Sequence, residues 1–431
     1  MYIIIFCDTA FESQGDTERV IYMKSGSINF CVVSAFLFAG LCNQAVAGDI
    51  TKQKPVWKTI LSYNDWMDMN PAVMKIQDGY FVTGISHHKT DSGKYEYKIV
   101  LWKIDLQGKE LWVKDINLPA WQDSFVPSRC FSLPDEPTLF VDESPGPHPR
   151  KAWLLRFDNA GAVVFSKEFS AQQVFDIQGL KKTNDGLFLY GSVHKTIYQQ
   201  EPNSDACVTK LDPNGNEIWR REYDKGKMEW GIGLAPLKDG GFVLSADSGN
   251  YNKFGAGPSE CWIIKCDPNG NILSETIFDG RHPSVTINGD ITAVVFNKEN
   301  FPQQDMSLIG LDSKLKTIWQ IDSLFGKTNG TGMLKTIVNK QGDFVIAGNK
   351  SLAAEIWKVG KDGKIIGELE IKDANLCVQF ESLLQTPTGY LVAGNGLTMS
   401  KMPLTADGKV AKGTKWDSMD ILVTEVADLT K

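Results

Sequence analysis

Histidines are the side chains in this 431-residue sequence best suited to metal binding or acid–base catalysis, and it has five of them. His87 and His88 are adjacent, His194 ends a similar apolar stretch, and His148 and His282 each precede a proline. No H-x-H or HExxH spacing joins any two of them. We therefore expect solvated loop histidines, no metal site and no cofactor.

The segments 212–215 and 267–270 both read Asp-Pro-Asn-Gly, which puts a carboxylate and an amide where calcium could bind. Each segment has a single carboxylate, whereas calcium takes about six to eight oxygen ligands. Asp, Pro and Asn-Gly are also the residues that tight turns require. We therefore expect turns at both segments. The sequence contains no G-x-S-x-G nucleophile elbow and no Walker loop, so no linear motif marks a catalytic centre.

Five cysteines follow residue 47, an odd number that leaves at least one thiol outside any intrachain disulfide. Cys261 and Cys266 lie in one expected strand, and their spacing puts them on opposite faces of it. Buried free thiols are therefore expected. The five are Cys130, Cys207, Cys261, Cys266 and Cys377.

The sequence around these residues repeats itself. One half of the unit is an apolar run, an Asp, a short turn and a second apolar run, recurring every 45 to 55 residues. The other half is a turn glycine followed five residues later by a small residue, as in Gly79 to Gly84. Each half predicts a β-hairpin, so each unit predicts four antiparallel strands, the pattern of a β-propeller blade. The first half is anchored at Asp105, Asp158, Asp212, Asp267, Asp312 and Gly360.

The two ends of the chain complete this pattern. Residues 56–61 resemble a lone last strand and residues 421–426 a lone third strand. Pairing them would close a ring and leave no open edge. We predict a single all-β domain over 48–431, a β-propeller of seven four-stranded blades. The fifth blade is the weakest, because only 284–287 and 291–296 resemble its first two strands; a missing strand would make six or eight blades.

The motif DGGFV at 239–243, followed by W-I-x-K-x-D-x-N-G-N at 262–271, resembles the tandem repeats of secreted bacterial β-propeller proteins. The Asp-x-x-Gly-x-x-x-Trp element at 105–112 and 212–219 is similar to the docking repeats of quinoprotein-like propellers, including the outer-membrane assembly scaffold of that class. The S-x-D-x-G-x-x-W box of sialidase propellers is absent. The resemblance covers nearly all of 56–427 and implies a fold, whose members do many different things.

The N-terminal region predicts export. Within 23–47, Met23-Lys24 is a short charged region, residues 28–41 form an apolar run too short to span a bilayer, and Ala45-Val46-Ala47 fits a cleavage site. We expect a mature, bacterial, periplasmic or secreted protein that begins at Gly48 and has no membrane span. Residues 1–22 contain four acids, fit no export signal, and are interpreted as an untranslated or disordered extension.

The tryptophans fall into two groups. Trp57, Trp112, Trp219 and Trp319 share one position of the repeat, which predicts packing between neighbouring blades. Trp66, Trp121 and Trp230 do not share it and precede the first strand of a unit, where they could bind a ligand or cap the blade end.

Loop lengths indicate which face is functional. The turns within hairpins are short and alike, whereas the connections between hairpins vary from blade to blade. We call the face with the hairpin turns the turn face and the other the loop face, and expect function on the loop face. Its expected binding residues are Trp66, Trp121, Trp230, Tyr198, Tyr251, Phe254 and Phe301.

The sequence favours a monomeric, non-catalytic scaffold that binds a protein or glycan through the loop face. The alternative is an enzyme at the mouth of the central channel, such as a glycan lyase or hydrolase or a quinoprotein-like dehydrogenase. The net charge of −7 argues against a nucleic-acid partner, which would need a basic face.

Overall fold

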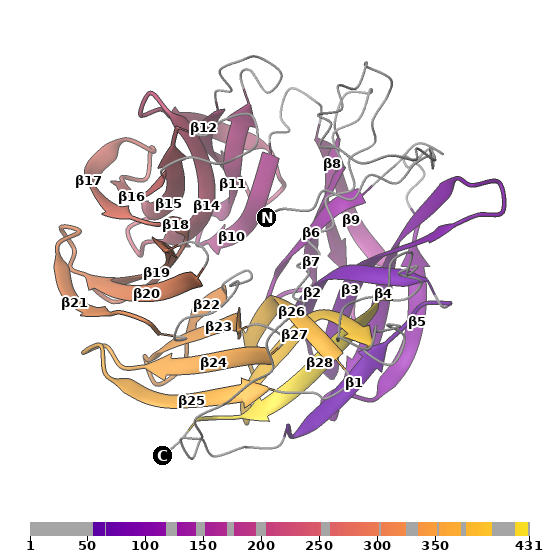
Figure 1. Cartoon of the computed structure of the whole chain (residues 1–431). Coiled ribbons are helices and arrows are strands. Elements are labelled where there is room, and N and C mark those ends of the chain that lie inside the picture. The colour runs from indigo at the N-terminus through magenta and orange to yellow at the C-terminus, as the bar shows by residue number, and fades with distance from the viewer. Residues whose placement is uncertain are drawn as a thin grey trace, which may run out of the picture.

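A computed structural model describes residues 55–64, 66–117, 127–143, 151–169, 176–194, 204–250, 259–300, 303–324, 335–350, 353–371, 376–398 and 419–429. The predicted signal and extension, residues 1–47, lie outside this set. Every secondary-structure element within it is a β-strand (Figure 1). No helix in the described ranges is long and apolar enough to cross a membrane.

The strands form antiparallel groups of four. In chain order they are β1 Trp57–Leu61; β2 Met67–Ile76, β3 Gly79–Lys89, β4 Tyr95–Asp105, β5 Glu110–Ile116; β6 Pro127–Leu133, β7 Thr138–Glu143, β8 Ala152–Phe157, β9 Val163–Phe169; β10 Asp176–Thr183, β11 Gly186–His194, β12 Ser204–Leu211, β13 Glu217–Tyr223; β14 Met228–Pro236, β15 Phe242–Gly249, β16 Ser259–Cys266, β17 Ile272–Asp279; β18 Arg281–Asn288, β19 Ile291–Asn300, β20 Gln303–Leu311, β21 Thr317–Ile321; β22 Lys335–Val338, β23 Phe344–Lys350, β24 Ala353–Val359, β25 Ile365–Ile371; β26 Leu376–Gln385, β27 Gly389–Thr398 and β28 Asp420–Ala427.

One sheet is larger than the rest, and one group that the sequence predicts only weakly is complete. The groups β10–β13 and β14–β17 join into one eight-stranded sheet through a single parallel bridge between Ser204 and Met228. The group β18–β21, which the sequence predicts only weakly, is a complete four-stranded sheet. Its first strand begins at Arg281, where the sequence pattern shows a strand only from Ser284 on, because a bulge shifts the register between those residues. No strand of this group is missing.

The last group joins the two ends of the chain. β1 pairs antiparallel with β28, with Trp57 opposite Glu425 and Leu61 opposite Ile421. The Trp57 Nε1 donates a hydrogen bond of 2.7 Å to Glu425 Oε2 across this pair. The sheet order is β1-β28-β27-β26, so the first described strand lies at its edge.

The first strand of each group is its inner strand, nearest the centre of the view in Figure 1. These strands contact one another in the order β2, β6, β10, β14, β18, β22 and β26, and β26 also contacts β2. The second and third strands β15 and β16 are nearly fully buried, whereas the last strands β9, β13 and β17 consist mainly of exposed and half-buried positions. The core therefore lies between the faces of neighbouring sheets.

The hairpin turns form as the sequence predicts. Asp212 Oδ1 accepts hydrogen bonds of 2.8 Å from the backbone N–H groups of Asn214 and Asn216. Asp267 does the same for Asn269 and Asn271, at 2.9 and 2.8 Å. The turn glycines adopt positive φ, which a side chain disfavours. These carboxylates are therefore used by the turns themselves.

The repeat-position tryptophans pack between sheets, as predicted. Trp57 lies over Gly108, Trp112 over Gly161, Trp219 over Gly270 and Trp319 over Gly363, so each ring from a last strand covers the turn glycine of the next group. The Trp319 Nε1 also donates a hydrogen bond of 2.8 Å to the Lys361 carbonyl. A glycine is needed at these turns because a Cβ would enter the ring.

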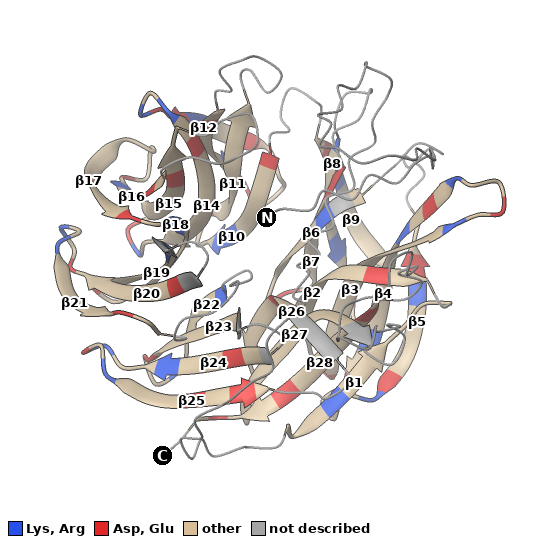
Figure 2. Cartoon of the chain, in the orientation of Figure 1, with Lys and Arg blue, Asp and Glu red and all other residues tan. Residues whose placement is uncertain are grey.

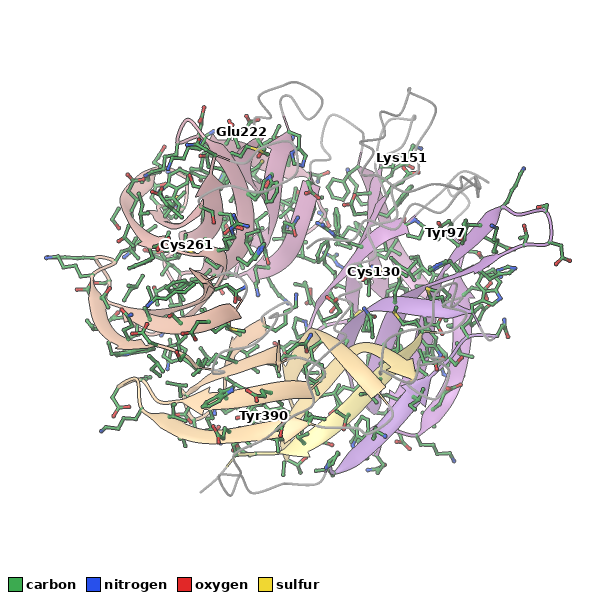
Figure 3. All side chains as sticks on the ribbon, in the orientation of Figure 1. Tyr97, Cys130, Lys151, Glu222, Cys261 and Tyr390 are labelled. Carbon is green, nitrogen blue, oxygen red and sulfur yellow. The ribbon has the colours of Figure 1, made fainter. Side chains whose placement is uncertain are left out.

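The cysteines are buried thiols. Cys130, Cys207, Cys261 and Cys266 are free and buried, and the side chain of Cys377 lies outside the described residues. Cys261 and Cys266 pack into two different core clusters, which confirms that they are on opposite faces of β16. Figure 3 shows Cys130 and Cys261 within the packed sheets.

Candidate functional site

An aromatic cluster lies at the loop-face end of the β2–β5 sheet. Trp66 precedes β2, and its ring meets Tyr63 edge-on at 5.6 Å between centroids. The His88 ring lies against the other side of Trp66, with centroids 3.9 Å apart and planes inclined by 34°. The Lys98 ammonium sits 5.4 Å from the Trp66 centroid and pairs with Asp115 at 3.0 Å. Trp66 is therefore half-buried in an ordered set of polar and aromatic groups.

The paired histidines correct the sequence expectation of solvated loop residues. Both lie inside β3, and His87 is only 7% exposed. Its ring stacks on Tyr97 with centroids 5.4 Å apart, and Figure 3 shows Tyr97 beside the projecting β3–β4 hairpin. Burial lowers the pKa of His87 to about 4, and the neighbouring His88 adds to the shift. Strand β3 extends beyond the apolar run of its sequence and includes His87 and His88, because aromatic rings cover this end of the strand.

The other two described histidines make polar contacts. His194 is the last residue of β11, and its Nε2 lies 3.5 Å from Asp176 Oδ2. His282, in β18, is exposed, and its Nδ1 lies 3.3 Å from Oδ2 of the buried Asp247. Neither is a loop residue as expected, and His148 lies outside the described residues.

The expected binding residues are only partly described. Trp230 lies in the inner strand β14, opposite Asp247 of β15, and is half-buried. Trp66 and Trp230 are not brought together: β2 and β14 are separated by β6 and β10 in the order of contacts and lie on opposite sides of the centre in Figure 1. Trp121, Tyr198, Tyr251, Phe254 and Phe301 lie outside the described residues.

The inner strands share a bulge that the sequence analysis missed. The register shifts at one place in each of β2, β6, β10, β14, β18 and β26. The residues at the shift include Gln178 in β10, Ile232 in β14 and Glu381 in β26. A bulge redirects the side chain it carries and is common near functional sites. No turn motif or alternation marks these positions, so only the pairing of the strands shows them.

Four charged residues on these strands form what we call the inner-strand cluster: Arg129 of β6, Lys181 of β10, Lys335 of β22 and Glu381 of β26. The positive charges of Lys335 and Arg129 act on the carboxyl group of Glu381, and that of Lys335 also acts on the ammonium group of Lys181. β10 and β22 are not neighbours in the order of contacts, and neither are β6 and β26. The charges therefore act on one another across the centre, where Figure 2 shows basic segments on β10 and β22.

Two side chains of this cluster have pKa values that burial moves away from their ordinary values. Burial raises the pKa of Glu381 to about 7, while Lys335 and Arg129 oppose the shift. Burial, together with the positive charge of Lys335, lowers the pKa of Lys181 to about 8. Arg129 is held by Asp176, with its Nη1 3.1 Å from Oδ1, and by the Ile177 carbonyl, also at 3.1 Å. Two basic groups that act on Glu381, with Lys181 acted on by the same Lys335, would attract an anionic ligand.

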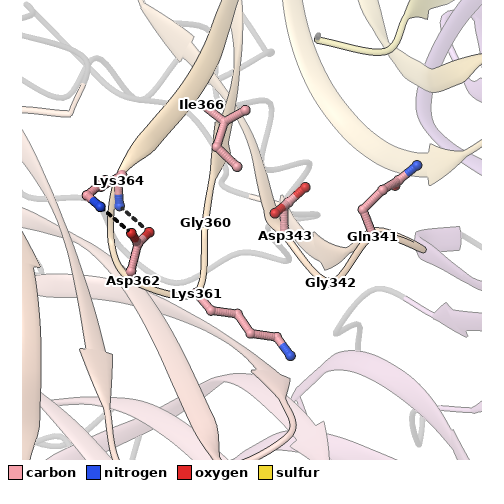
Figure 4. A pocket seen from close by; sticks show the side chains of 8 residues that line it. All are labelled: Gln341, Gly342, Asp343, Gly360, Lys361, Asp362, Lys364 and Ile366. Atoms are coloured by element: carbon pink, nitrogen blue, oxygen red, sulfur yellow. Dashed lines mark hydrogen bonds and ion pairs between the residues drawn. The ribbon is translucent and has the colours of Figure 1, made fainter. Parts of the chain in front are cut away.

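A hollow of about 530 Å³ opens at the turn face of the β22–β25 sheet (Figure 4). Residues of two hairpin turns line it, mostly glycines and charged side chains, with Asp362 paired to Lys364 at 2.8 Å. It is open to solvent and holds no aromatic ring, so it offers little to enclose a ligand.

No protein-family model matches the chain, and no curated protein sequence matches it significantly. Solved structures similar to it include Drosophila Plexin A in complex with Semaphorin 1b, at 9% identity over 88% of each chain with a TM-score of 0.45. A putative 6-phosphogluconolactonase from Bacteroides uniformis is 13% identical over 82% of this chain and 98% of its own, with a TM-score of 0.47. The WD40 domain of Neurospora crassa Pan2 is 10% identical over 73% and 94%, with a TM-score of 0.41.

These similar structures are β-propeller proteins. At such low identities and TM-scores they carry no argument about activity, and both enzymes and binding proteins are among them. The fold of this chain is seen in its own strand pairing: all-β, four-stranded antiparallel groups arranged like the blades of a propeller.

Proposed function

We propose that the chain is an exported, seven-bladed β-propeller that binds a protein or glycan on its loop face and receives an acidic group of that partner at the inner-strand cluster. The seven four-strand groups, the cyclic contacts of their inner strands and the β1–β28 pair support the blade number and the closure. Residues 23–47 support export, and a mature N-terminus at Gly48 in mass spectrometry would test it.

The observation that carries the binding proposal is that Lys335 and Arg129 act on Glu381 from different inner strands, while Lys335 also acts on Lys181. Gathering like charges at the centre of a ring costs stability, because each side chain repels the next. Arg129 is paired with Asp176 of β10, whereas Lys181 and Lys335 come from strands that do not pair with each other. A ligand that brings negative charge would relieve the repulsion.

The test uses acidic glycans of known composition. Wild-type protein is titrated with polygalacturonate and with a neutral glucan of similar length, at low and at physiological salt. We expect binding of the acidic polymer that weakens with salt and falls at least tenfold in Lys335→Gln. The matched control is Lys340→Gln, which removes an exposed charge on the turn face. Equal affinity for both polymers, or an equal loss in both variants, would contradict the proposal.

A second candidate, an enzyme at the mouth of the centre, is favoured by Glu381 alone. A carboxyl with a pKa of about 7 can give or take a proton at neutral pH, as a general acid or base must. Under this candidate, incubation with an acidic glycan would release shorter products. Glu381→Gln would stop their release and keep binding, whereas undegraded polymer with the wild type would rule out glycan cleavage.

A further inference from the structure

Three carboxylates meet on the loop face where the β10–β13 and β14–β17 groups join. Asp205 is in β12, Asp224 follows β13, and Glu229 is in β14. One oxygen from each lies within 4.8 Å of the others. Asp205 and Glu229 are buried, at 1% and 0% exposure, whereas Asp224 is exposed. Three negative charges this close repel one another strongly when two of them are out of water.

Glu229 provides a second, separate observation. Its Oε1 accepts hydrogen bonds from the Lys227 backbone N–H at 3.2 Å and from Ser248 Oγ at 3.1 Å. Its Oε2 is buried and has no hydrogen-bond partner. A buried carboxylate oxygen left without a donor is costly, so such an oxygen normally faces a cation or a donor.

The lysines of the same segment are directed elsewhere. Lys227 Nζ pairs with Glu260 at 2.8 Å, and Lys225 Nζ lies 3.8 Å from Glu275 and over the Trp262 ring. Burial raises the pKa of Glu229, and the charge of Asp224 adds to the shift. Neither lysine therefore reaches the unpartnered Oε2 of Glu229.

We infer that Asp205, Asp224 and Glu229 bind a divalent cation of the calcium class. Carboxylate oxygens are the ligands that such hard cations prefer. Two oxygens bound to calcium at about 2.3–2.6 Å can be at most about 5 Å apart, which all pairs here satisfy. Magnesium, at about 2.1 Å, would require separations nearer 4 Å or less. The exposed side of Asp224 leaves room for water ligands.

The bound cation would hold together the two four-strand groups of the eight-stranded sheet. The groups are joined here by the Ser204–Met228 bridge, by a hydrogen bond of 3.3 Å from Ser204 Oγ to the Glu229 carbonyl, and by one of 3.1 Å from the Gly231 N–H to Ser192 Oγ. A cation between β12 and β14 would add ionic bonds across this junction, next to Trp230. It would fix the loop-face end of the inner strand β14.

The test is the melting temperature of the full mature protein in EDTA, in CaCl2 and in MgCl2, with calorimetric titration of CaCl2. We expect calcium to raise the melting temperature by several degrees, saturably, with a smaller effect of magnesium. Glu229→Gln should lose the calcium response and, in EDTA, melt at or above the wild-type temperature, because an uncompensated buried charge is gone. Asp290→Asn, an exposed turn carboxylate, is the matched control and should keep the full response.

If Glu229→Gln does not fold, Asp224→Asn provides the same test from an exposed position, and it should weaken calcium binding at least tenfold. Identical wild-type melting in calcium and EDTA with no heat of binding would overturn the inference. An undiminished calcium response in Glu229→Gln or Asp224→Asn would place the cation elsewhere and overturn it equally. Both readouts are independent of any glycan or protein partner.

Discussion

The turn face and the loop face use their polar side chains in opposite ways. On the turn face, Asp212 and Asp267 cap their own turns. Lysines of the third strands reach back to the first turn of their group, as in Lys103 to Asp78 at 2.7 Å and Lys210 to Asp185 at 2.5 Å. The same contacts recur from sheet to sheet, which is what a structural role requires.

In the described ranges, the loop face has a contact that recurs, a serine of the second strand donating to a carboxylate of the first, as in Ser86 to Asp68 and Ser248 to Glu229, and it has groups that occur in one place each. Trp66 with His88 occurs in one sheet, the carboxylate cluster at one junction, and Glu381 in one inner strand. Groups that differ between otherwise similar repeats are not needed to form the repeat. The comparison indicates that the contacts that stabilise the fold are spread over the turn face and the core. The side chains suited to binding or catalysis lie on the loop face and the inner strands.

The largest effect is expected from removing the strand that joins the chain ends. Deleting residues 419–431 exposes the buried partners of Ile421, Leu422, Val423 and Val426. Each such side chain contributes about 1.5–3 kcal/mol, so the sum rivals the about 5–15 kcal/mol that stabilises a typical domain. We expect no cooperative melting near the wild-type temperature, as followed by circular dichroism. A truncated protein that melts like the wild type would show that the fold does not depend on the β1–β28 pair.

The next effect separates tryptophans of the two faces. Trp219→Ala removes a ring that packs on Phe188, Phe242 and the Gly270 turn, and should cost about 2–3 kcal/mol of unfolding free energy. Trp66→Ala, at the edge of a core cluster, should cost less. Urea denaturation of both variants measures the difference. A larger loss for Trp66→Ala would make that residue a structural cap and weaken the distinction between the faces.

A smaller effect compares two glycines with nearly the same backbone. Gly270 has φ of +81° and Gly226 has φ of +80°, so alanine strains both by about 1–2 kcal/mol. A Cβ at Gly270 would also come within 2.8 Å of Arg221 and 3.2 Å of Trp219, whereas nothing lies within 4 Å of one at Gly226. We expect Gly270→Ala to be the more destabilised in urea with EDTA present. Equal losses would mean that docking of Trp219 adds nothing at this turn.

The smallest effect is a change in pH dependence. Glu381 has a folded pKa of about 7, above its ordinary value of 4.5. It binds its proton more tightly when folded, so its favourable contribution is complete below about pH 4.5 and is lost as the pH rises through 7. Glu381→Gln should therefore melt like the wild type at pH 4.5 and above it at pH 7.5. Parallel melting curves over this range would place the Glu381 carboxyl in water rather than among the inner strands.

Much of the fold could be predicted from the sequence because its signals are local. An Asp followed by a positive-φ glycine, between apolar runs, encodes a hairpin, and its recurrence encodes the repeated groups. Pairing of residues 57–61 with 421–425 followed from the leftover strands at the ends. One turn departs from this pattern. Leu315 has φ of +61° at the position where the other turns have glycine, and its burial in a core cluster offsets the backbone strain.

The candidate site was largely beyond prediction because it is built from contacts between distant segments. The bulge that carries Glu381 has no sequence signature, and Arg129, Lys181 and Lys335 resemble ordinary strand lysines and arginines. Asp205, Asp224 and Glu229 come from two four-strand groups, so no spacing in the sequence reveals them. Trp66 was found because it breaks the repeat, and His87 was misjudged because its burial depends on aromatic residues of the next strand.

The most direct test of the difference between the faces uses a partner that has been captured on the wild-type protein. The affinity of two double variants for this partner is compared. One variant is Trp66→Ala with Trp230→Ala on the loop face, and the other is Asn214→Ala with Asn269→Ala on exposed turns of the opposite face. Binding is measured by calorimetry after both variants are shown to melt cooperatively. We predict that the loop-face variant loses at least about thirtyfold in affinity, as expected when an aromatic anchor is truncated, and that the turn-face variant binds like the wild type. A greater loss in the turn-face variant would contradict the account.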